Sequence, residues 1–201
     1  MTTAVDLCNI ALGYLGDEAT VSSLDPPEGS VQADHCARFY PIARDTLLDG
    51  HPWGFATGER SLGRLNLTPS SWLYAYAVPS DMLRLLGLTQ DGVTIKEFER
   101  ATGEPGQEII LCNAENPVAR FTYRVSDTAL FPPLFSQALV WHLASLLAGP
   151  LMKGSSGAQQ AQRCAMLAEN YLEKAKAADA MQTKRRVPYE SPWLKARRGD
   201  G

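Results

Sequence analysis

The side chains that could carry chemistry in this sequence are three histidines and four cysteines, and their spacing favours no active site. His35, His51 and His142 lie far apart, and no HExxH motif, GxSxG motif or phosphate-binding loop accompanies them. The cysteines stand at positions 8, 36, 112 and 164 without a CxxC pair, which is unlike the usual zinc and disulfide patterns. We therefore expect buried, reduced thiols and structural histidines, with no cofactor, no metal and no enzymatic activity.

The carboxylates offer no catalytic pair either. Asp6 and Asp45 are single acidic residues within helical patterns, and Asp45 directly follows Arg44, which indicates a structural ion pair. His51 lies in a turn beside Pro52, where we expect it to cap the preceding helix. A hydrolase acting on sugars would need two carboxylates held close together, and the sequence offers no pair that can be named.

The end of the chain differs in charge from the rest. Residues 183–201 contain six basic residues against two acidic ones, a net charge of +4. Residues 1–182 contain 13 basic and 20 acidic residues, a net charge of −7. The tail also carries apolar and aromatic residues, which dominate protein interfaces and which a purely solubilising segment would not need. We expect it to dock on a partner through Lys184, Arg185, Arg186, Val187, Tyr189, Trp193, Leu194, Lys195, Arg197 and Arg198.

The elements that must position these residues follow from the apolar spacing. Recurrence of apolar residues every three or four positions predicts helices over about 3–16, 31–48, 133–149 and 157–181. The third of these is apolar nearly all round and should be the most buried. The fourth is rich in alanine on one face, which allows a neighbour to approach closely.

The middle of the chain, about residues 53–126, has the character of β-structure. Short runs of aromatic and β-branched residues alternate there with turn residues. They predict four strands in one small antiparallel meander, at 72–78, 93–99, 108–112 and 119–125.

These elements together predict an α+β fold. We expect a four-helix bundle built from both chain ends, with a small antiparallel β-sheet insertion and an extended C-terminal tail. The chain then divides into a core of residues 1–182 and a docking tail of residues 183–201.

No segment has the composition of a membrane span or a signal peptide. The longest apolar stretch, residues 138–151, is shorter than the ~18–20 residues that cross a bilayer and contains polar residues. The N-terminus lacks a basic region before its apolar pattern. We therefore expect synthesis in a cytoplasm and no membrane partner.

Three separated stretches together resemble a known family. Residues 4–16 read AVDLCNIALGYLG, residues 39–62 contain Tyr-Pro, Ala-Arg-Asp and Pro-Trp-Gly-Phe-Ala, and residues 72–88 contain Tyr-Ala-Tyr followed by Pro-Ser-Asp. In this order they resemble the tail tubular protein A, or head-to-tail adaptor (connector), family of tailed bacteriophages. The resemblance covers roughly the first 90 residues.

The motif residues are expected mainly to specify the fold. The corner around Trp53 should seat the β-rich part on the helices, and the residues at 74–81 should be core and turn. The set comprises Tyr40, Pro41, Arg44, Asp45, Pro52, Trp53, Phe55, Tyr74, Tyr76, Pro79 and Asp81.

The resemblance implies a structural virion protein at the head–tail junction. Family members form a ring, typically a dodecamer, beneath the portal protein and extend the DNA channel. The implied partners are the portal protein, further copies of this chain, a distal tail or nozzle protein, and packaged DNA that passes through the lumen without sequence-specific binding and is later ejected. In related adaptors the C-terminal segment reaches onto the portal, a role that falls by position to residues 183–201.

A ring also sets two physical requirements. Each subunit needs two different complementary faces, and the alanine-rich helix at 158–181 is expected to supply one of them. The lumen must not bind DNA, so we expect acidic or neutral side chains to line it.

Two other functions stay open at this point. One is a hydrolase-like tail protein that contacts surface carbohydrate through the β-rich region, which a cleft with two close carboxylates would favour. The other is a DNA-binding accessory protein that uses the basic tail, which salt-dependent DNA affinity of the tail would favour.

Overall fold

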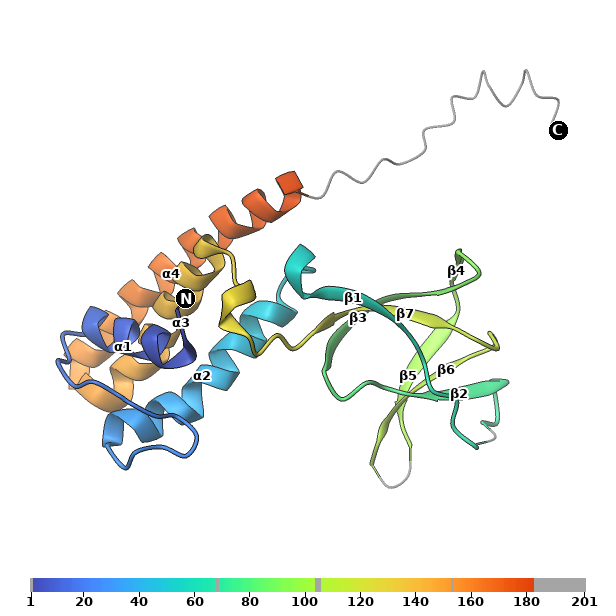
Figure 1. Ribbon diagram of the computed structural model, residues 1–201, viewed down its shortest axis with the longest axis horizontal. Helices are drawn as coiled ribbons and strands as arrows, with labels where there is room; N and C mark the ends of the chain where they lie inside the picture. The colour runs from blue at the N-terminus through green and yellow to red at the C-terminus, as the bar shows by residue number, and fades with distance from the viewer. Residues whose placement is uncertain (1, 68, 104–105, 153, 183–201) are drawn as a thin grey trace, which may run out of the picture.

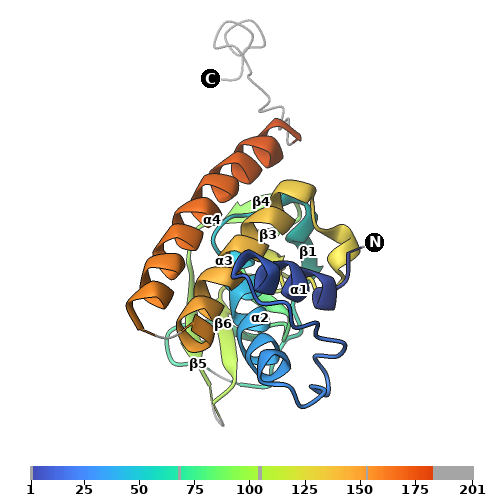
Figure 2. The ribbon, with the colours of Figure 1, turned by 90° about the vertical axis from the view of Figure 1, so that its left-hand side faces the viewer.

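The computed structural model describes residues 2–67, 69–103, 106–152 and 154–182. Within these residues, four α-helices gather in one part of the molecule and seven β-strands in another (Figure 1). The chain forms two helices, crosses to the strands, and returns for the last two helices. Figure 2 looks onto the helical part, with the strands behind it.

Local signals fix where the first two helices begin. α1 (Ala4–Tyr14) starts after Thr3, whose hydroxyl accepts a hydrogen bond from the Asp6 N–H (3.1 Å). The Asp6 carboxylate in turn accepts one from the Thr3 N–H (2.7 Å), which completes a capping box. α2 (Val31–Asp49) starts after Ser30, whose hydroxyl caps its first turn.

The third helix is the centre of the helical part. α3 (Pro133–Met152) contacts α1 and α2, and α4 (Gly154–Gln182) runs back along it. Because α3 is apolar nearly all round, it can bury a face against each neighbour. Its buried side chains are Phe135, Ala138, Leu139, Val140, Leu143, Ala144, Leu147 and Ala148.

By length and composition alone, α3 could also cross a membrane, contrary to expectation. It has 20 residues and a mean hydropathy of 1.3 over its most apolar window. The core helix of a protein that lies in water meets the same criteria, and 44% of this window is buried within the molecule. The helix therefore carries no conclusion about localisation.

The predicted four-helix bundle is wrong. In such a bundle each helix packs against two neighbours around one shared core. Here α3 is the common neighbour, and within the described residues α4 makes no comparable contact with α1 or α2. The β-structure is also more than a small insertion, because two antiparallel sheets occupy most of residues 57–123.

The strands form two antiparallel sheets with a common core. Their bounds are β1 (Thr57–Ser61), β2 (Tyr74–Ala77), β3 (Met82–Gln90), β4 (Val93–Ile95), β5 (Phe98–Thr102), β6 (Glu108–Cys112) and β7 (Val118–Tyr123). One sheet has the order β1-β7-β3-β4 and the other the order β2-β6-β5. Buried residues from both sheets, including Tyr76, Leu88, Ile110 and Phe121, form one apolar cluster.

The predicted single meander is therefore also wrong. β3 was not predicted from the sequence. Its pairing with β7 shifts register at Met82/Arg84 and at Leu85/Gly87, and these shifts interrupt the alternation of apolar and polar side chains that identifies a strand. β1 is a polar strand at a sheet edge, where apolar alternation is not required. The run at 93–99 is two strands, β4 and β5, which belong to different sheets.

Gly157 marks a close approach of α4 to α3. A methyl group at this position would lie 3.0 Å from the Ala148 carbonyl oxygen and 3.4 Å from the Met152 Cβ. We expect Gly157→Leu to lower the free energy of unfolding by about 1–3 kcal/mol, because the backbone of α3 cannot turn away. Chemical denaturation measures the change. Gly149→Leu is the matched control, since a methyl group there meets nothing within 4 Å. An equal loss at both positions would contradict the close approach.

His142, on α3, makes stability depend on pH. Burial lowers its pKa below the ordinary value. The unfolded chain then binds this proton more readily than the folded chain, so stability falls as the pH drops through about 6.5, by at most about 1.4 kcal/mol per pH unit. Thermal denaturation between pH 7.5 and 5.5 should show a shallower decline for His142→Gln than for the wild type. Parallel profiles would contradict this role of His142.

Candidate functional site

Two of the three motif stretches meet where the helical part joins the β part. Arg44 and Asp45 lie near the end of α2, Trp53 lies in the turn that follows, and Asp81 directly precedes β3. Arg124 comes directly after β7. We call these five residues and their immediate contacts the helix–sheet junction.

Asp45 pairs with two guanidinium groups, one from its neighbour on α2 and one from the sheet side. Its Oδ1 accepts a hydrogen bond from Arg44 Nε (2.7 Å), and its Oδ2 accepts one from Arg124 Nε (2.8 Å). The predicted Arg44–Asp45 ion pair is thus confirmed. Ion pairs near the surface contribute only about 0–1 kcal/mol each, so this pairing fixes geometry more than stability.

Asp81 holds the sheet side of the junction. Its carboxylate accepts two hydrogen bonds from the Arg60 guanidinium (3.0 and 3.1 Å), and its carbonyl accepts one from the Arg124 N–H (2.8 Å). A second bidentate pair joins Arg84 on β3 to Asp49 at the end of α2 (3.1 Å for both bonds). Paired bonds of this kind fix relative orientation, so the two parts meet at a defined angle.

The aromatic corner after Pro52 forms the apolar side of the junction. Trp53 is 1% exposed, and its Nε1–H donates to the Leu47 carbonyl (2.8 Å). The rings of Trp53 and Phe55 each meet the Phe135 ring edge-on, with centroids 5.1 Å apart. The predicted core corner is confirmed, and it joins α2, β1 and the start of α3.

Tyr40 and Pro41 lie further back along α2. Tyr40 is buried, and burial raises its pKa to about 12. Pro41 lies on the exposed side, and the helix continues through it to Asp49. Neither residue contributes to a ligand site in the described part of the chain.

The motif residues at 74–79 are core and turn, as expected. Tyr76 is 1% exposed, and its hydroxyl lies 2.6 Å from the carbonyl oxygens of Ala114 and Glu115. Tyr74 is half-buried on the same strand. The Pro79 carbonyl accepts a hydrogen bond from the Met82 N–H (2.9 Å), which closes the turn into β3.

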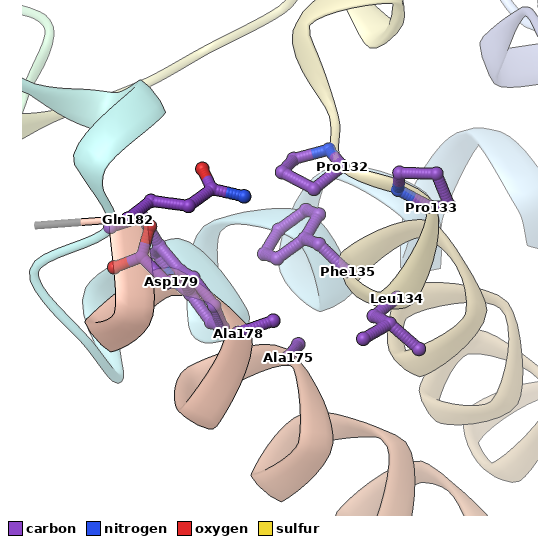
Figure 3. A pocket seen from close by; sticks show the side chains of 9 residues that line it. Pro132, Pro133, Leu134, Phe135, Ala175, Ala178, Asp179 and Gln182 are labelled. Atoms are coloured by element: carbon purple, nitrogen blue, oxygen red, sulfur yellow. The ribbon is translucent and has the colours of Figure 1, made fainter.

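A pocket of about 280 Å³ lies beside the junction, where α3 begins and α4 ends (Figure 3). Its walls are mostly apolar, with one carboxylate and one amide. The lining residues are Trp53, Pro132, Pro133, Leu134, Phe135, Ala175, Ala178, Asp179 and Gln182. No sequence pattern pointed to this pocket, because its walls come from three separate segments of the chain, at residue 53, at 132–135 and at 175–182.

Asp179 closes one side of the pocket and connects α4 to the aromatic corner. Its Oδ1 accepts a hydrogen bond from the Gly54 N–H (2.9 Å), and its Oδ2 lies 3.2 Å from His51 Nε2. The prediction that His51 caps α2 is therefore wrong. The cap residue is Gly50, whose N–H bonds to the Thr46 carbonyl.

The His51–Asp179 pair lacks the groups that would make it a catalytic site. The described residues that line the pocket include no hydroxyl, thiol or amine nucleophile and only one carboxylate. In the described ranges, no group of three or more His, Cys, Asp or Glu side chains could hold a metal ion. The pair is best explained as a structural tie between α4 and the corner.

The cysteines are buried and free, as expected. Burial raises the pKa of Cys112 and of Cys164, which keeps both thiols protonated and unreactive. The expected docking residues, from Lys184 to Arg198, lie outside the described residues.

Comparison of the sequence with known proteins identifies no relative. No protein-family model matches the sequence, and a search of curated proteins finds no similar one. The resemblance to phage connectors therefore depends on the three motif stretches alone.

Proposed function

We propose that this protein is a head-to-tail connector of a tailed bacteriophage, which forms a ring beneath the portal and joins the capsid vertex to the tail. One observation carries the proposal. Residues of two motif stretches that resemble those of connectors lie at the helix–sheet junction: Asp45 accepts a hydrogen bond from Arg124, the Asp81 carbonyl accepts one from the Arg124 N–H, and Trp53 and Phe55 pack against Phe135. Two stretches that are separate in the sequence therefore contribute to the same junction.

We assign one of the two ring interfaces to the outer side of α4. A ring needs a different face on each side of the subunit. α4 exposes two large apolar side chains, Met166 (66% exposed) and Met181 (79% exposed). Alanines at 158, 165, 177 and 180 are also exposed, and their small size allows a neighbouring subunit to approach closely.

The charge distribution supports a channel that DNA passes without binding. Residues 1–52 contain eight acidic and two basic residues, a net charge of −6. Most of the excess negative charge of the core therefore lies on α1, α2 and the loop between them. Such a surface repels phosphates.

We expect residues 1–182 to bind double-stranded DNA only weakly. A chain truncated after Gln182 should show no salt-sensitive, sub-micromolar affinity in fluorescence anisotropy, because binding by lysine and arginine would release counterions and fall with salt. Circular dichroism of the truncated chain, compared with the full chain, controls for folding. Tight binding that weakens steeply with salt would contradict a DNA-repelling channel.

Co-sedimentation with the cognate portal assembly tests the proposed function. The full chain should sediment with the portal at a fixed ratio that does not rise with excess chain. A chain that stays in the supernatant at all concentrations, while its circular dichroism shows a folded protein, would contradict the proposal.

A further inference from the structure

We propose that the pocket at the end of α4 receives the aromatic ring of Tyr189 from the tail of the same chain. This contact is distinct from the proposed attachment to a portal and does not depend on it. The Tyr189 ring would fill the pocket, and the contact would hold the tail against the body of the protein at this residue.

The pocket suits one aromatic side chain. Prolines 132 and 133, Leu134, Phe135 and two alanines of α4 form its walls. A cavity of roughly 150 Å³ lined by apolar side chains holds a benzene molecule, so about 280 Å³ accommodates a tyrosine ring. Figure 3 shows Pro132, Pro133 and Leu134 opposite Ala178, Asp179 and Gln182, with the Phe135 ring between them.

The pocket has a polar rim on the side of α4. The Gln182 side chain extends across this side toward Pro132 (Figure 3). An amide here can hydrogen-bond a phenol hydroxyl while the ring lies among apolar atoms. Tyrosine combines these two properties, whereas valine and leucine offer no hydroxyl.

Chain continuity makes the tail the nearest available occupant. Gln182 lines the pocket, and the next residue begins the tail. Tyr189 follows seven residues later, a reach of up to ~25 Å for an extended chain, which is ample for a return to the pocket. A tethered side chain at this distance has an effective concentration in the millimolar range. Pro188 immediately before it favours a turn.

Tyr189 is also the first aromatic residue of the tail. Val187 is nearer but smaller, and Trp193 lies four residues further on, beyond the acidic Glu190. The two aromatic residues expected to dock on a partner thus receive different roles. Tyr189 binds the body of its own chain, and Trp193 remains for the partner.

Binding of Tyr189 in the pocket would shorten the length of tail that can reach a partner. With Tyr189 fixed, only residues 190–201 extend from the body, a reach of up to ~43 Å instead of ~68 Å for the whole tail. A shorter tether raises the effective concentration of Trp193 near a partner on the same side of the molecule.

NMR of the full chain with methyl-labelled alanine tests the contact directly. The Ala175 and Ala178 methyl groups lie in the pocket wall and would feel the ring current of Tyr189. We expect Tyr189→Ser to move both signals, and Trp193→Ser, the matched control in the same tail, to leave them in place. Trypsin should also cleave after Arg186 faster in Tyr189→Ser than in the wild type, because the bound tail must open before cleavage.

Three outcomes would overturn the proposal. Signals unmoved by either variant would mean that the pocket does not hold the tail. Signals moved only by Trp193→Ser would assign the wrong aromatic residue. Wild-type signals that shift with protein concentration would show that a tail from another copy occupies the pocket. Because no portal is present, each result is independent of the proposed function.

Discussion

Replacing Trp53 by alanine should lower the free energy of unfolding by about 3–5 kcal/mol, the largest loss expected for a substitution in this chain. The side chain is 1% exposed and fills the corner between α2, η1 (Gly54–Ala56) and α3. Its removal leaves a cavity and also strips the Leu47 carbonyl of the indole donor 2.8 Å away. Urea denaturation followed by circular dichroism measures the change.

Trp72→Ala is the matched control for this prediction. Trp72 is also a tryptophan with a hydrogen-bonded indole, which donates to Glu99 Oε2 (3.0 Å), but it is only half-buried at the surface of the second sheet. We expect it to cost less than half as much as Trp53→Ala. Similar losses for the two variants would mean that the aromatic corner does not hold the two parts together.

Replacing Trp193 by alanine should abolish measurable attachment to the portal while the melting temperature stays unchanged. A central tryptophan in an interface typically contributes at least about 2 kcal/mol, which is about 30-fold in affinity for a single tail. In a ring the loss recurs in every subunit, because the tails bind together and their affinities combine through avidity. Co-sedimentation with the portal measures attachment, and differential scanning calorimetry measures stability.

The control for this prediction removes an exposed apolar side chain from the body. Leu67 is 46% exposed on the loop between β1 and β2. Leu67→Ala should attach as well as the wild type. Intact attachment of Trp193→Ala would contradict the role of this residue as the anchor, and equal loss in both variants would show that the assay reports general apolar adhesion.

The helices could be predicted more fully than the sheets because their signals are local. The apolar spacing of residues 4–15 and the cap at Thr3 define α1 without reference to the rest of the chain. The strands depend on distant partners, as in the pairing of Thr57 with Thr122. The bulges in β3 then removed the alternation by which a strand is recognised. The arrangement of helices was missed because an all-round apolar helix does not reveal which neighbours it will contact.

The same distinction applies to the junction. The Arg44–Asp45 pair was predicted because the two residues are adjacent in sequence. The partners Arg60 and Arg124 were not, since only the paired strands β1 and β7 bring them to Asp81 and Asp45. Asp179 is one of three carboxylates on α4, and no sequence pattern singled it out. Its role follows only from its position next to His51.

Electron microscopy of the full chain mixed with its portal assembly tests the central claim most directly. The proposal predicts closed rings of fixed rotational symmetry stacked on one end of the portal, with an open channel along the shared axis. Portal particles that remain bare beside a folded chain, or chains bound without rotational order, would contradict the claim that this protein functions as a repeated subunit around the DNA channel.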